Sequence, residues 1–310
     1  MFFSGNKNSI DYRFRCIRYF IWSSFLKKIL KENLKIIADL ERIKRYEETG
    51  IFCNGERCDF NFITPEEICE PADLLLFTVK FDGLKQAIES VKHHVGHNTI
   101  ILSALNGISS EEIIGQTYGM DKILYCVAQG MDAVKVGNKL TYANKGMLCF
   151  GDKEAGVISE KTNRVANFFE QVELPYEIDT NMLHRLWGKF MLNVGVNQTV
   201  AVYKSNYGEV QREGDARNTM ISAMREVIAL SEKESVSLRE EDLYYWLNVL
   251  GTLSPEGKPS MAQDVDAHRP SEVELFSGTV LKLGKKHGIP TPINKMLYEQ
   301  FQIIESEYVH

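Results

Sequence analysis

Short apolar runs separated by amphipathic stretches fill the first half of the chain. Continuous apolar runs of this length are typical of parallel strands that are buried on both faces. The pattern predicts strands at 34–38, 51–54, 74–80, 99–105 and 123–127, and helices at 83–94, from 109 onward and at 160–173. Two further runs, 139–144 and 147–151, predict an antiparallel pair around the Lys145-Gly146 turn. Strands that alternate with helices indicate a parallel, doubly wound sheet.

The pattern changes at about residue 181, where long amphipathic stretches replace the short apolar runs. Helices are expected at 183–203, 216–234, 240–250 and 271–287. The last of them ends at Gly288, with Pro290 and Pro292 beyond it, which is a normal helix stop. The sequence therefore predicts two domains: an α/β Rossmann-like domain over residues 1–179 and an all-α domain over residues 180–310.

Composition agrees with two globular domains and excludes several classes of protein. The 310 residues are 44% hydrophobic and 25% charged, whereas a single domain usually has about 100–200 residues. With a net charge of −6, the chain lacks the basic surface that general nucleic-acid binding requires. No apolar run reaches the ~18 residues of a membrane-spanning helix, since Arg18 interrupts the run over 16–26. We expect a cytoplasmic protein without nucleic-acid or membrane partners.

Neither the cysteines nor the clustered histidines follow a metal-binding pattern. The six cysteines are scattered, and Cys53 and Cys58 do not have the CxxC spacing of zinc or redox sites. We interpret them as reduced thiols, buried or at the surface. His93, His94 and His97 are interpreted as a solvated helix end, and no metal is expected.

A polar stripe interrupts the predicted helix at 183–203. Lys189, Asn193 and Asn197 step by four, so they share one helix face, and their neighbours are apolar. An ammonium and amides that are buried must be paired with protein groups or with a ligand. One interpretation is a polar seam between two helices. The other is a site lining a cleft, where the amides bind a hydroxyl or carbonyl and the lysine is a general acid.

Three more polar positions stand where chemistry is expected. Lys80 and Asn106 follow two predicted strands, and ligands of open α/β sheets bind outside the carboxyl ends of strands. Each of the two, taken singly, is more simply explained as a turn residue, whereas the two together favour a ligand site. Glu272 follows Pro270 at the start of a predicted helix, so a solvated carboxylate at a helix N-terminus is an equal alternative for it.

Together these residues form an ordered set that resembles the ketopantoate reductase (2-dehydropantoate 2-reductase) family. Each motif alone is weak, but five motifs in order on the predicted elements are specific. The resemblance runs from about residue 34 to the C-terminus and rests on Val79-Lys80, Asn106-Gly107, Trp187-x-Lys189-x-x-x-Asn193-x-x-x-Asn197, Ser260-Met261-x-Gln263-Asp264 and Ser271-Glu272. It implies an N-terminal Rossmann domain, an all-helical C-terminal domain and an active site between them.

The resemblance also implies a role for each residue. Lys189 is expected to be the general acid that protonates the alkoxide as hydride from NADPH reaches the ketone carbon. Glu272 is expected to contact the cofactor ribose or to steady the lysine. The expected substrate ligands are Asn106, Asn193, Asn197 and Ser260, and the expected cofactor ligands are Lys80, Asn106 and Glu272. The implied partner is a small 2-keto acid, and a homodimer is compatible with the sequence.

One departure from the family pattern concerns the choice of cofactor. Where the family often has an arginine that reads the 2′-phosphate of NADP, this chain has Asp39. A carboxylate there normally suits the free ribose of NAD. Arg42, Lys44 and Arg45 follow closely and are expected to supply the positive charge instead, so NADP(H) is the predicted cofactor.

A second departure is the absence of the glycine-rich phosphate loop. The first fifty residues contain Gly5 and Gly50 as their only glycines. A Rossmann fold needs G-x-G-x-x-G after its first strand, because only glycine lets the backbone approach the pyrophosphate. The first strand and the loop of the Rossmann-like domain are therefore interpreted as corrupted.

Arginines at the fingerprint spacing point to a frame-shifted origin for this segment. Arg13-x-Arg15-x-x-Arg18 becomes G-x-G-x-x-G if arginine codons ending in GG are read one base later, and Trp22 becomes a further glycine. With permitted codons, residues 7–12 become an apolar first strand. The alternative is coincidence in a diverged terminus. We expect the chain as it stands to bind NADPH poorly, because arginine side chains would block the loop.

Three functions therefore compete. An NADPH-dependent ketopantoate reductase of pantothenate and coenzyme A biosynthesis accounts for the site residues. An inactive relative, which at most binds a small acid, accounts for the missing loop. A reductase of another branched 2-keto acid would share the polar stripe and differ in the shape of its pocket.

Overall fold

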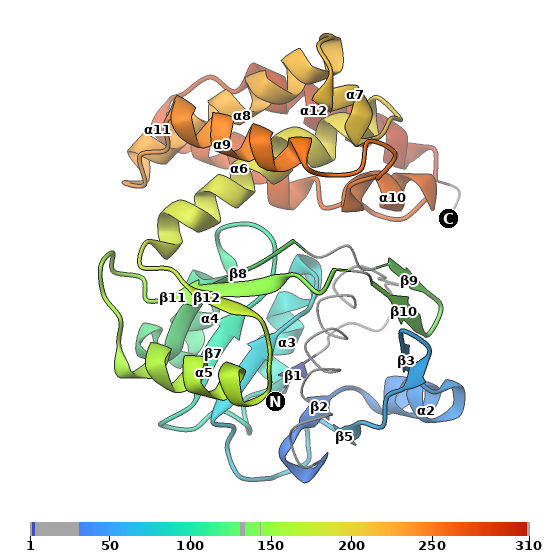
Figure 1. Ribbon diagram of the computed structural model, residues 1–310, viewed down its shortest axis with the longest axis vertical. Helices are drawn as coiled ribbons and strands as arrows, with labels where there is room; N and C mark the ends of the chain where they lie inside the picture. Colours follow the sequence, from blue (N-terminus) through green and yellow to red (C-terminus); the bar gives the residue numbers. More distant parts are fainter. Residues whose placement is uncertain (1, 4–30, 131–133, 143, 309–310) are drawn as a thin grey trace. The chain divides into compact units, whose positions relative to one another are not determined.

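Figure 1 shows the computed structural model, which describes residues 2–3, 31–130, 134–142 and 144–308. Backbone contacts divide the chain into two compact units, Met1–Met182 and Leu183–His310, and each unit is described by itself. Arg13, Arg15 and Arg18, together with the predicted strand at 7–12, lie outside the described residues. None of the helices in the described ranges combines the length and apolar character that a bilayer crossing requires.

The first unit is built on one large, mostly parallel sheet. Its strands are, in spatial order, β12 (Tyr176–Ile178), β11 (Met147–Gly151), β8 (Ile123–Gln129), β7 (Ile100–Ser103), β6 (Leu74–Phe77), β1 (Phe2–Phe3), β2 (Lys35–Ile37) and β5 (Asn61–Ile63). The run from β5 to β8 is parallel, whereas β11 is antiparallel to β8. Numbered along the chain, the six parallel strands have the order 3-2-1-4-5-6 of dinucleotide-binding sheets. The predicted Rossmann-like α/β fold is therefore confirmed. The interpretation of its first strand as corrupted is corrected in one respect, because β1 occupies the first-strand position by pairing in parallel with both β2 and β6.

The predicted antiparallel pair of 139–144 and 147–151 is wrong. β10 (Lys139–Thr141) belongs instead to a small second sheet, where it lies between β3 (Phe52–Cys53) and β9 (Val134–Val136), with β4 (Glu56–Arg57) at the edge. β11 lies between β8 and β12 in the large sheet. The reason is burial on both faces: Leu148, Cys149 and Phe150 are all fully buried. A two-stranded hairpin would leave one face of that run in water.

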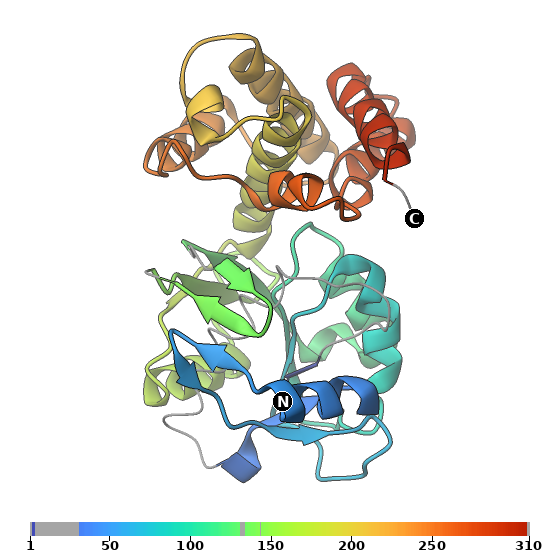
Figure 2. The ribbon, with the colours of Figure 1, turned by 90° about the vertical axis from the view of Figure 1, so that its right-hand side faces the viewer.

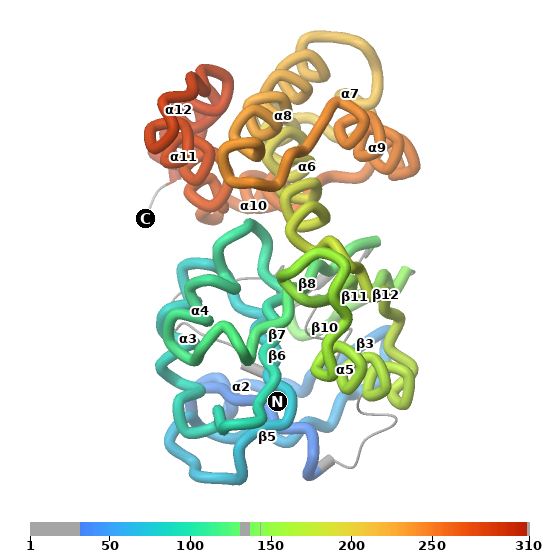
Figure 3. The backbone as a smooth tube through the Cα atoms, turned by 90° about the vertical axis from the view of Figure 1, so that its left-hand side faces the viewer, coloured from blue at the N-terminus to red at the C-terminus, as the bar shows by residue number. Residues whose placement is uncertain are grey.

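Helices cover both faces of the large sheet (Figures 2 and 3). On one face lie α3 (Leu84–Ser90) and α4 (Ser110–Tyr118); on the other lie α5 (Glu160–Gln171) and the small sheet. On the second face, alternate strand residues such as Leu102 and Phe150 pack with Val165 and Phe169 of α5, as the period of two along a strand requires. A further helix, α2 (Leu40–Thr49), begins shortly after β2.

The second unit is all-helical in its described residues. Its elements are α6 (Met182–Val202), α7 (Tyr207–Gln211), α8 (Asp215–Lys233), α9 (Glu240–Gly251), α10 (Ser260–Asp266), the π-helix η4 (Glu274–Gly278), α11 (Thr279–His287) and α12 (Pro292–Ser306). The helices predicted at 183–203, 216–234 and 240–250 are present as α6, α8 and α9. α12 was not predicted, because Pro292 was interpreted as a stop, although proline is well tolerated in the first turn of a helix.

The single helix predicted at 271–287 is wrong in its first part. Helical structure starts at Glu274 and its first turn is π, with the amide of Gly278 donating to the carbonyl of Val273 (2.9 Å). The amide of Ser277 donates instead to the side-chain oxygen of Gln198 on α6 (3.2 Å). A side chain that enters the helical ladder displaces its hydrogen bonds in this way, and such π-turns are frequent at functional sites.

Candidate active site

Lys80 and Asn106 lie at equivalent positions at the carboxyl edge of the large sheet. β6 and β7 are adjacent and parallel, with Phe77 opposite Ser103 at their last residues, so each side chain stands three residues beyond its strand. Both are half-buried. Gly107 has φ 92°, which allows the sharp turn directly after Asn106. The sheet order reverses between β1 and β6, so Lys80 follows a strand at the switch point, where such folds bind ligands.

A buried hydroxyl–carboxyl chain holds the loop that carries Asn106. The hydroxyls of Ser103, at the end of β7, and Ser110, in the first turn of α4, are 2.8 Å apart. The hydroxyl of Ser110 donates to Oε2 of Glu111 at 2.8 Å. Burial raises the pKa of Glu111 to about 7, and the Ser110 hydrogen bond opposes that shift. These hydrogen bonds therefore connect the end of β7 to the start of α4 and hold the two ends of the intervening loop together.

The end of β2 carries both a carboxylate and a group of cations. Asp39 is the N-cap of α2: its Oδ1 accepts the amide of Arg42 at 2.9 Å, and its Oδ2 is 3.8 Å from the Arg42 guanidinium. Arg42 is buried, whereas Lys44 and Arg45 are exposed. Arg45 also stacks over the ring of Tyr46, 5.6 Å from its centroid. This end of the sheet thus presents exposed positive charge next to a carboxylate that is already hydrogen-bonded.

In the second unit, the polar stripe runs along α6 as the spacing predicts. Lys189, Asn193 and Asn197 lie within the unbroken helix Met182–Val202 and therefore share one face. Lys189 and Asn193 are half-buried, and Asn197 is 7% exposed. The buried side chains on either side of the stripe are apolar, among them Phe190 and Val194. A cationic donor and two amides thus lie on one partly buried face of α6, where electrostatic interactions are stronger than in bulk water.

The other faces of α6 are occupied by neighbouring helices. A Cβ at Gly188 would overlap the indole of Trp246 on α9, and a Cβ at Gly195 would lie 2.5 Å from Cγ of Met224 on α8. These two glycines therefore permit close helix packing beside Lys189 and Asn193. The packing fixes the rotation of α6, and with it the direction in which the stripe faces.

A network with a buried centre joins α6 to the π-helix. Oε1 of Gln198 accepts both the amide (3.2 Å) and the hydroxyl (2.6 Å) of Ser277, and its Nε2 donates to the carbonyl of Val194 (2.7 Å). Asn294 of α12 continues the network to Ser277 (3.2 Å) and to Glu226 of α8 (2.7 Å). The network holds the segment after Glu272 against the helix that carries the stripe.

Ser260 and Glu272 lie at the two ends of one connected segment. Ser260 is the first residue of α10 and is half-buried. The Arg269 guanidinium binds the buried Asp264 of α10 at 2.9 Å and so ties the following loop to that helix. Glu272 is 6% exposed and stands two residues before the π-helix, so its interpretation as a solvated carboxylate at a helix start is wrong.

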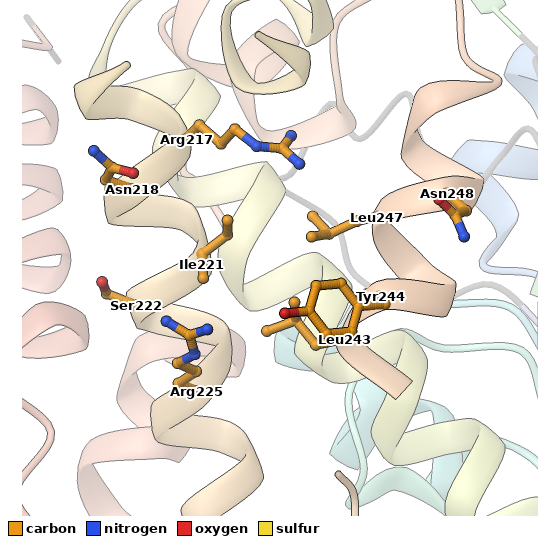
Figure 4. Close-up of a pocket in the computed structure, with 9 residues that line it drawn as sticks. All are labelled: Arg217, Asn218, Ile221, Ser222, Arg225, Leu243, Tyr244, Leu247 and Asn248. Atoms are coloured by element: carbon orange, nitrogen blue, oxygen red, sulfur yellow. The ribbon is translucent and has the colours of Figure 1, made fainter. Parts of the chain in front are cut away.

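A groove of about 430 Å³ between α8 and α9 contains none of the predicted site residues (Figure 4). Arg217 and Arg225 of α8 face Tyr244 and other side chains of α9 across it. The Arg225 guanidinium is bound by both carboxylate oxygens of Glu240, at 2.9 and 3.1 Å, and Arg217 donates to two backbone carbonyls. Because both cations are engaged in structural contacts, the groove is not a candidate anion site.

Sequence reasoning missed the groups that hold the site. No role was assigned to Glu111 or to Gln198 from the sequence. Gln198 directly follows Asn197 in a helix that the sequence predicts to be buried. That position was the available signal, since a buried amide needs hydrogen-bond partners. No local signal identified those partners, because Ser277 and Asn294 are remote in sequence.

Comparisons with known proteins agree with this architecture. Residues 21–154 match the family model described as "Ketopantoate reductase PanE/ApbA", and residues 181–305 match "Ketopantoate reductase PanE/ApbA C terminal". A 2-dehydropantoate 2-reductase of Streptococcus pyogenes serotype M3 is 26% identical over 263 residues, covering 84% of this chain and 85% of that protein.

Solved structures show the same fold. A PanE/ApbA family ketopantoate reductase from Ralstonia eutropha JMP134 has a TM-score of 0.81 at 21% identity, with 100% of both chains covered. A D-mandelate dehydrogenase solved with NADH and anilino(oxo)acetate has a TM-score of 0.83 at 18% identity, with 99% of both chains covered. The chain joins a domain with the strand order of dinucleotide-binding sheets to an all-helical unit. With both family models matched in order, the chain belongs to the ketopantoate reductase family.

Proposed function

We propose that this chain is an oxidoreductase that reduces ketopantoate (2-dehydropantoate) to pantoate with NADPH, a step of pantothenate and coenzyme A biosynthesis. The observation that carries the proposal is the stripe of Lys189, Asn193 and Asn197 on α6. A ketone reduction needs a proton donor at the developing oxyanion, and a cationic donor also stabilises that charge. The amides suit the hydroxyl and carboxylate of the substrate.

The roles proposed for the residues follow from their chemistry. The Lys189 ammonium donates its proton to the carbonyl oxygen as negative charge develops there, and takes up a new proton from solvent. Asn193, Asn197 and Ser260 orient the substrate by hydrogen bonds. Glu272, buried at 6% exposure, either contacts the cofactor ribose or steadies the lysine. Asn106 is proposed to contact both the substrate and the nicotinamide.

The carboxyl edge of the first unit fits a dinucleotide cofactor. Bound NADPH would supply the hydride for the ketone carbon. Lys80 stands at the switch point of the sheet, and Lys44 and Arg45 offer exposed positive charge beyond β2, which suits the 2′-phosphate of NADPH. The carboxylate of Asp39 is already hydrogen-bonded within the helix cap, which reduces its repulsion of that phosphate.

A second candidate is an NADH-dependent reductase of another branched 2-keto acid. The position of Asp39 directly after β2 favours it, because a carboxylate there normally binds the free ribose diol of NAD. One protein of the same fold, the D-mandelate dehydrogenase, was solved with NADH. This candidate uses the same stripe on α6 and differs in cofactor and in pocket shape.

A matrix of cofactors and substrates separates these functions. Initial rates of NADPH and NADH oxidation are measured with ketopantoate, ketoisovalerate and benzoylformate. They are measured for the chain as it stands and for a frame-corrected chain, in which residues 7–24 are replaced by the translation of the next reading frame. The proposal expects the highest kcat/KM with NADPH and ketopantoate. Preference for NADH and another acid would favour the second candidate. Folded protein that binds cofactor but oxidises it with none of the acids would indicate an inactive relative.

A further inference from the structure

A cysteine and a buried histidine meet at the amino edge of the large sheet. Sγ of Cys69 lies 3.3 Å from Nδ1 of His94. The His94 side chain is fully buried, so its interpretation as part of a solvated helix end is wrong, and Cys69 is partly exposed. A sulfur that solvent reaches on one side and an imidazole contacts on the other has the arrangement of a nucleophile and its base.

Backbone and side-chain hydrogen bonds hold the two residues in place. The amide of Ala72 donates to the carbonyl of His94 (2.9 Å), and the hydroxyl of Thr99 donates to the carbonyl of Ala72 (2.6 Å). The amide of Gly96 donates to the same hydroxyl at 2.8 Å. These bonds clamp the loop before β6 onto the loop before β7. The Cys69–His94 contact is therefore held by hydrogen bonds between the two loops.

The surroundings of His94 favour its neutral form, whose Nδ1 can accept a hydrogen bond from the thiol. Burial, assisted by the positive charges of His93 and Lys35, lowers the pKa of His94, while Glu67 opposes the shift. The imidazole is therefore neutral at neutral pH. A hydrogen bond from the ring to the backbone of Pro65 also opposes the shift, and Nε2 of the ring is buried.

We propose that Cys69, paired with His94, is a thiol-modification site that reacts with small disulfides. The residues of the proposed reductase site in this unit, Lys80 and Asn106, follow the carboxyl ends of β6 and β7, whereas Cys69 and His94 precede the amino ends of the same strands. The modification site is thus separate from the proposed reductase site and does not depend on the proposed function.

The reaction is a thiol–disulfide exchange. The proton of the Cys69 thiol passes to Nδ1 of His94, and the sulfur attacks one sulfur of the small disulfide. A new S–S bond forms at Cys69 while the original S–S bond breaks. The leaving thiolate takes up a proton, from His94 or from solvent. One half of the small disulfide remains bound to Cys69 as a mixed disulfide, and the other half leaves as a thiol. The small disulfide is itself the oxidant of the cysteine, so no other oxidant is needed.

Peptide mapping after brief exposure to dithiodipyridine at neutral pH tests the proposal. The internal control is Cys58, which is also partly exposed but whose sulfur faces the backbone carbonyl of Glu56 at 3.9 Å. Cys69 should be modified at least roughly tenfold faster than Cys58, the order of effect expected from a positioned base. In the His94→Gln variant, the Cys69 rate should fall by roughly tenfold and the Cys58 rate should stay unchanged.

Two results would overturn the proposal. One is a Cys69 rate equal to or below that of Cys58 in the unaltered chain. The other is an unchanged Cys69 rate in a folded His94→Gln variant. If that variant is unfolded, the buried Cys126 becomes modified as well, and the ratio of Cys69 to Cys58 rates in the unaltered chain then decides the question by itself.

Discussion

Lys189 is the side chain on which the proposed chemistry depends most directly. We expect Lys189→Ala to lower kcat by roughly 10²–10⁴-fold, the usual contribution of a positioned proton donor. Lys233→Ala is the matched control, because this lysine is exposed at the end of α8. Steady-state kinetics of both variants check the expectation. Turnover of Lys189→Ala within twofold of the control would exclude Lys189 as the proton donor.

A second prediction at the scale of single residues concerns the pH dependence of stability. The pKa of Glu111 is raised from 4.5 to about 7 in the fold. The folded state therefore holds this proton more tightly than the unfolded chain does. The stability that the protonated Glu111 provides is fully present below the pKa of this carboxyl in the unfolded chain, and it is lost as the pH rises through about 7. Relative to the unaltered chain, Glu111→Gln should gain stability between pH 5 and pH 8, by up to about 3 kcal/mol.

Glu112→Gln provides the control of opposite sign. Hydrogen bonds from Lys153 and Tyr125 lower the pKa of Glu112. Its contribution to stability is present above the unfolded pKa and is lost as the pH falls, so this variant should lose stability at neutral pH and above. Denaturant unfolding at the two pH values measures both variants. A stability difference for Glu111→Gln that does not change with pH would contradict the assigned titration.

At the scale of elements, α6 depends on two glycines for its packing. Gly188→Ala and Gly195→Ala should each destabilise the second unit by about 1–3 kcal/mol, because the added methyl overlaps Trp246 or Met224. Gly251→Ala, at the end of α9, is the control: nothing lies within 4 Å of its Cβ position, so alanine should be neutral or stabilise by up to about 1 kcal/mol. Thermal unfolding of the three variants tests this packing. Equal melting temperatures for all three would contradict it.

Elements with a strong local signal were predictable, and those that depend on partners were not. The apolar runs at 74–80 and 99–105 predicted β6 and β7, and the spacing of four placed Lys189, Asn193 and Asn197 on one face of a helix. The partner of 147–151 was predicted wrongly, because strand pairing is a long-range choice governed by burial. The π-turn of 274–278 could not be predicted, since it arises from Gln198, which is distant in sequence.

At the scale of the whole molecule, we propose that the sequence of the N-terminal segment decides whether the cofactor binds. The family match starts at residue 21, so Arg13, Arg15 and Arg18 lie outside it, and the frame-shifted origin of this segment remains our proposal. The chain as it stands should bind NADPH weakly, whereas the frame-corrected chain should bind with a Kd of about 1 μM, which corresponds to about −8 kcal/mol. Fluorescence titration of NADPH measures both. A micromolar Kd for the chain as it stands, with the reading frame verified in the gene, would refute the frame shift.

Transfer of deuterium from NADPH to ketopantoate tests the central claim most directly. NADPH labelled with deuterium at the transferred position of C4 is incubated with ketopantoate and either the unaltered or the frame-corrected chain, and the product is analysed by mass spectrometry. The account predicts pantoate carrying deuterium at C2, formed in larger amount by the frame-corrected chain and strongly reduced by Lys189→Ala. Absence of labelled pantoate with a folded, NADPH-binding chain would contradict it.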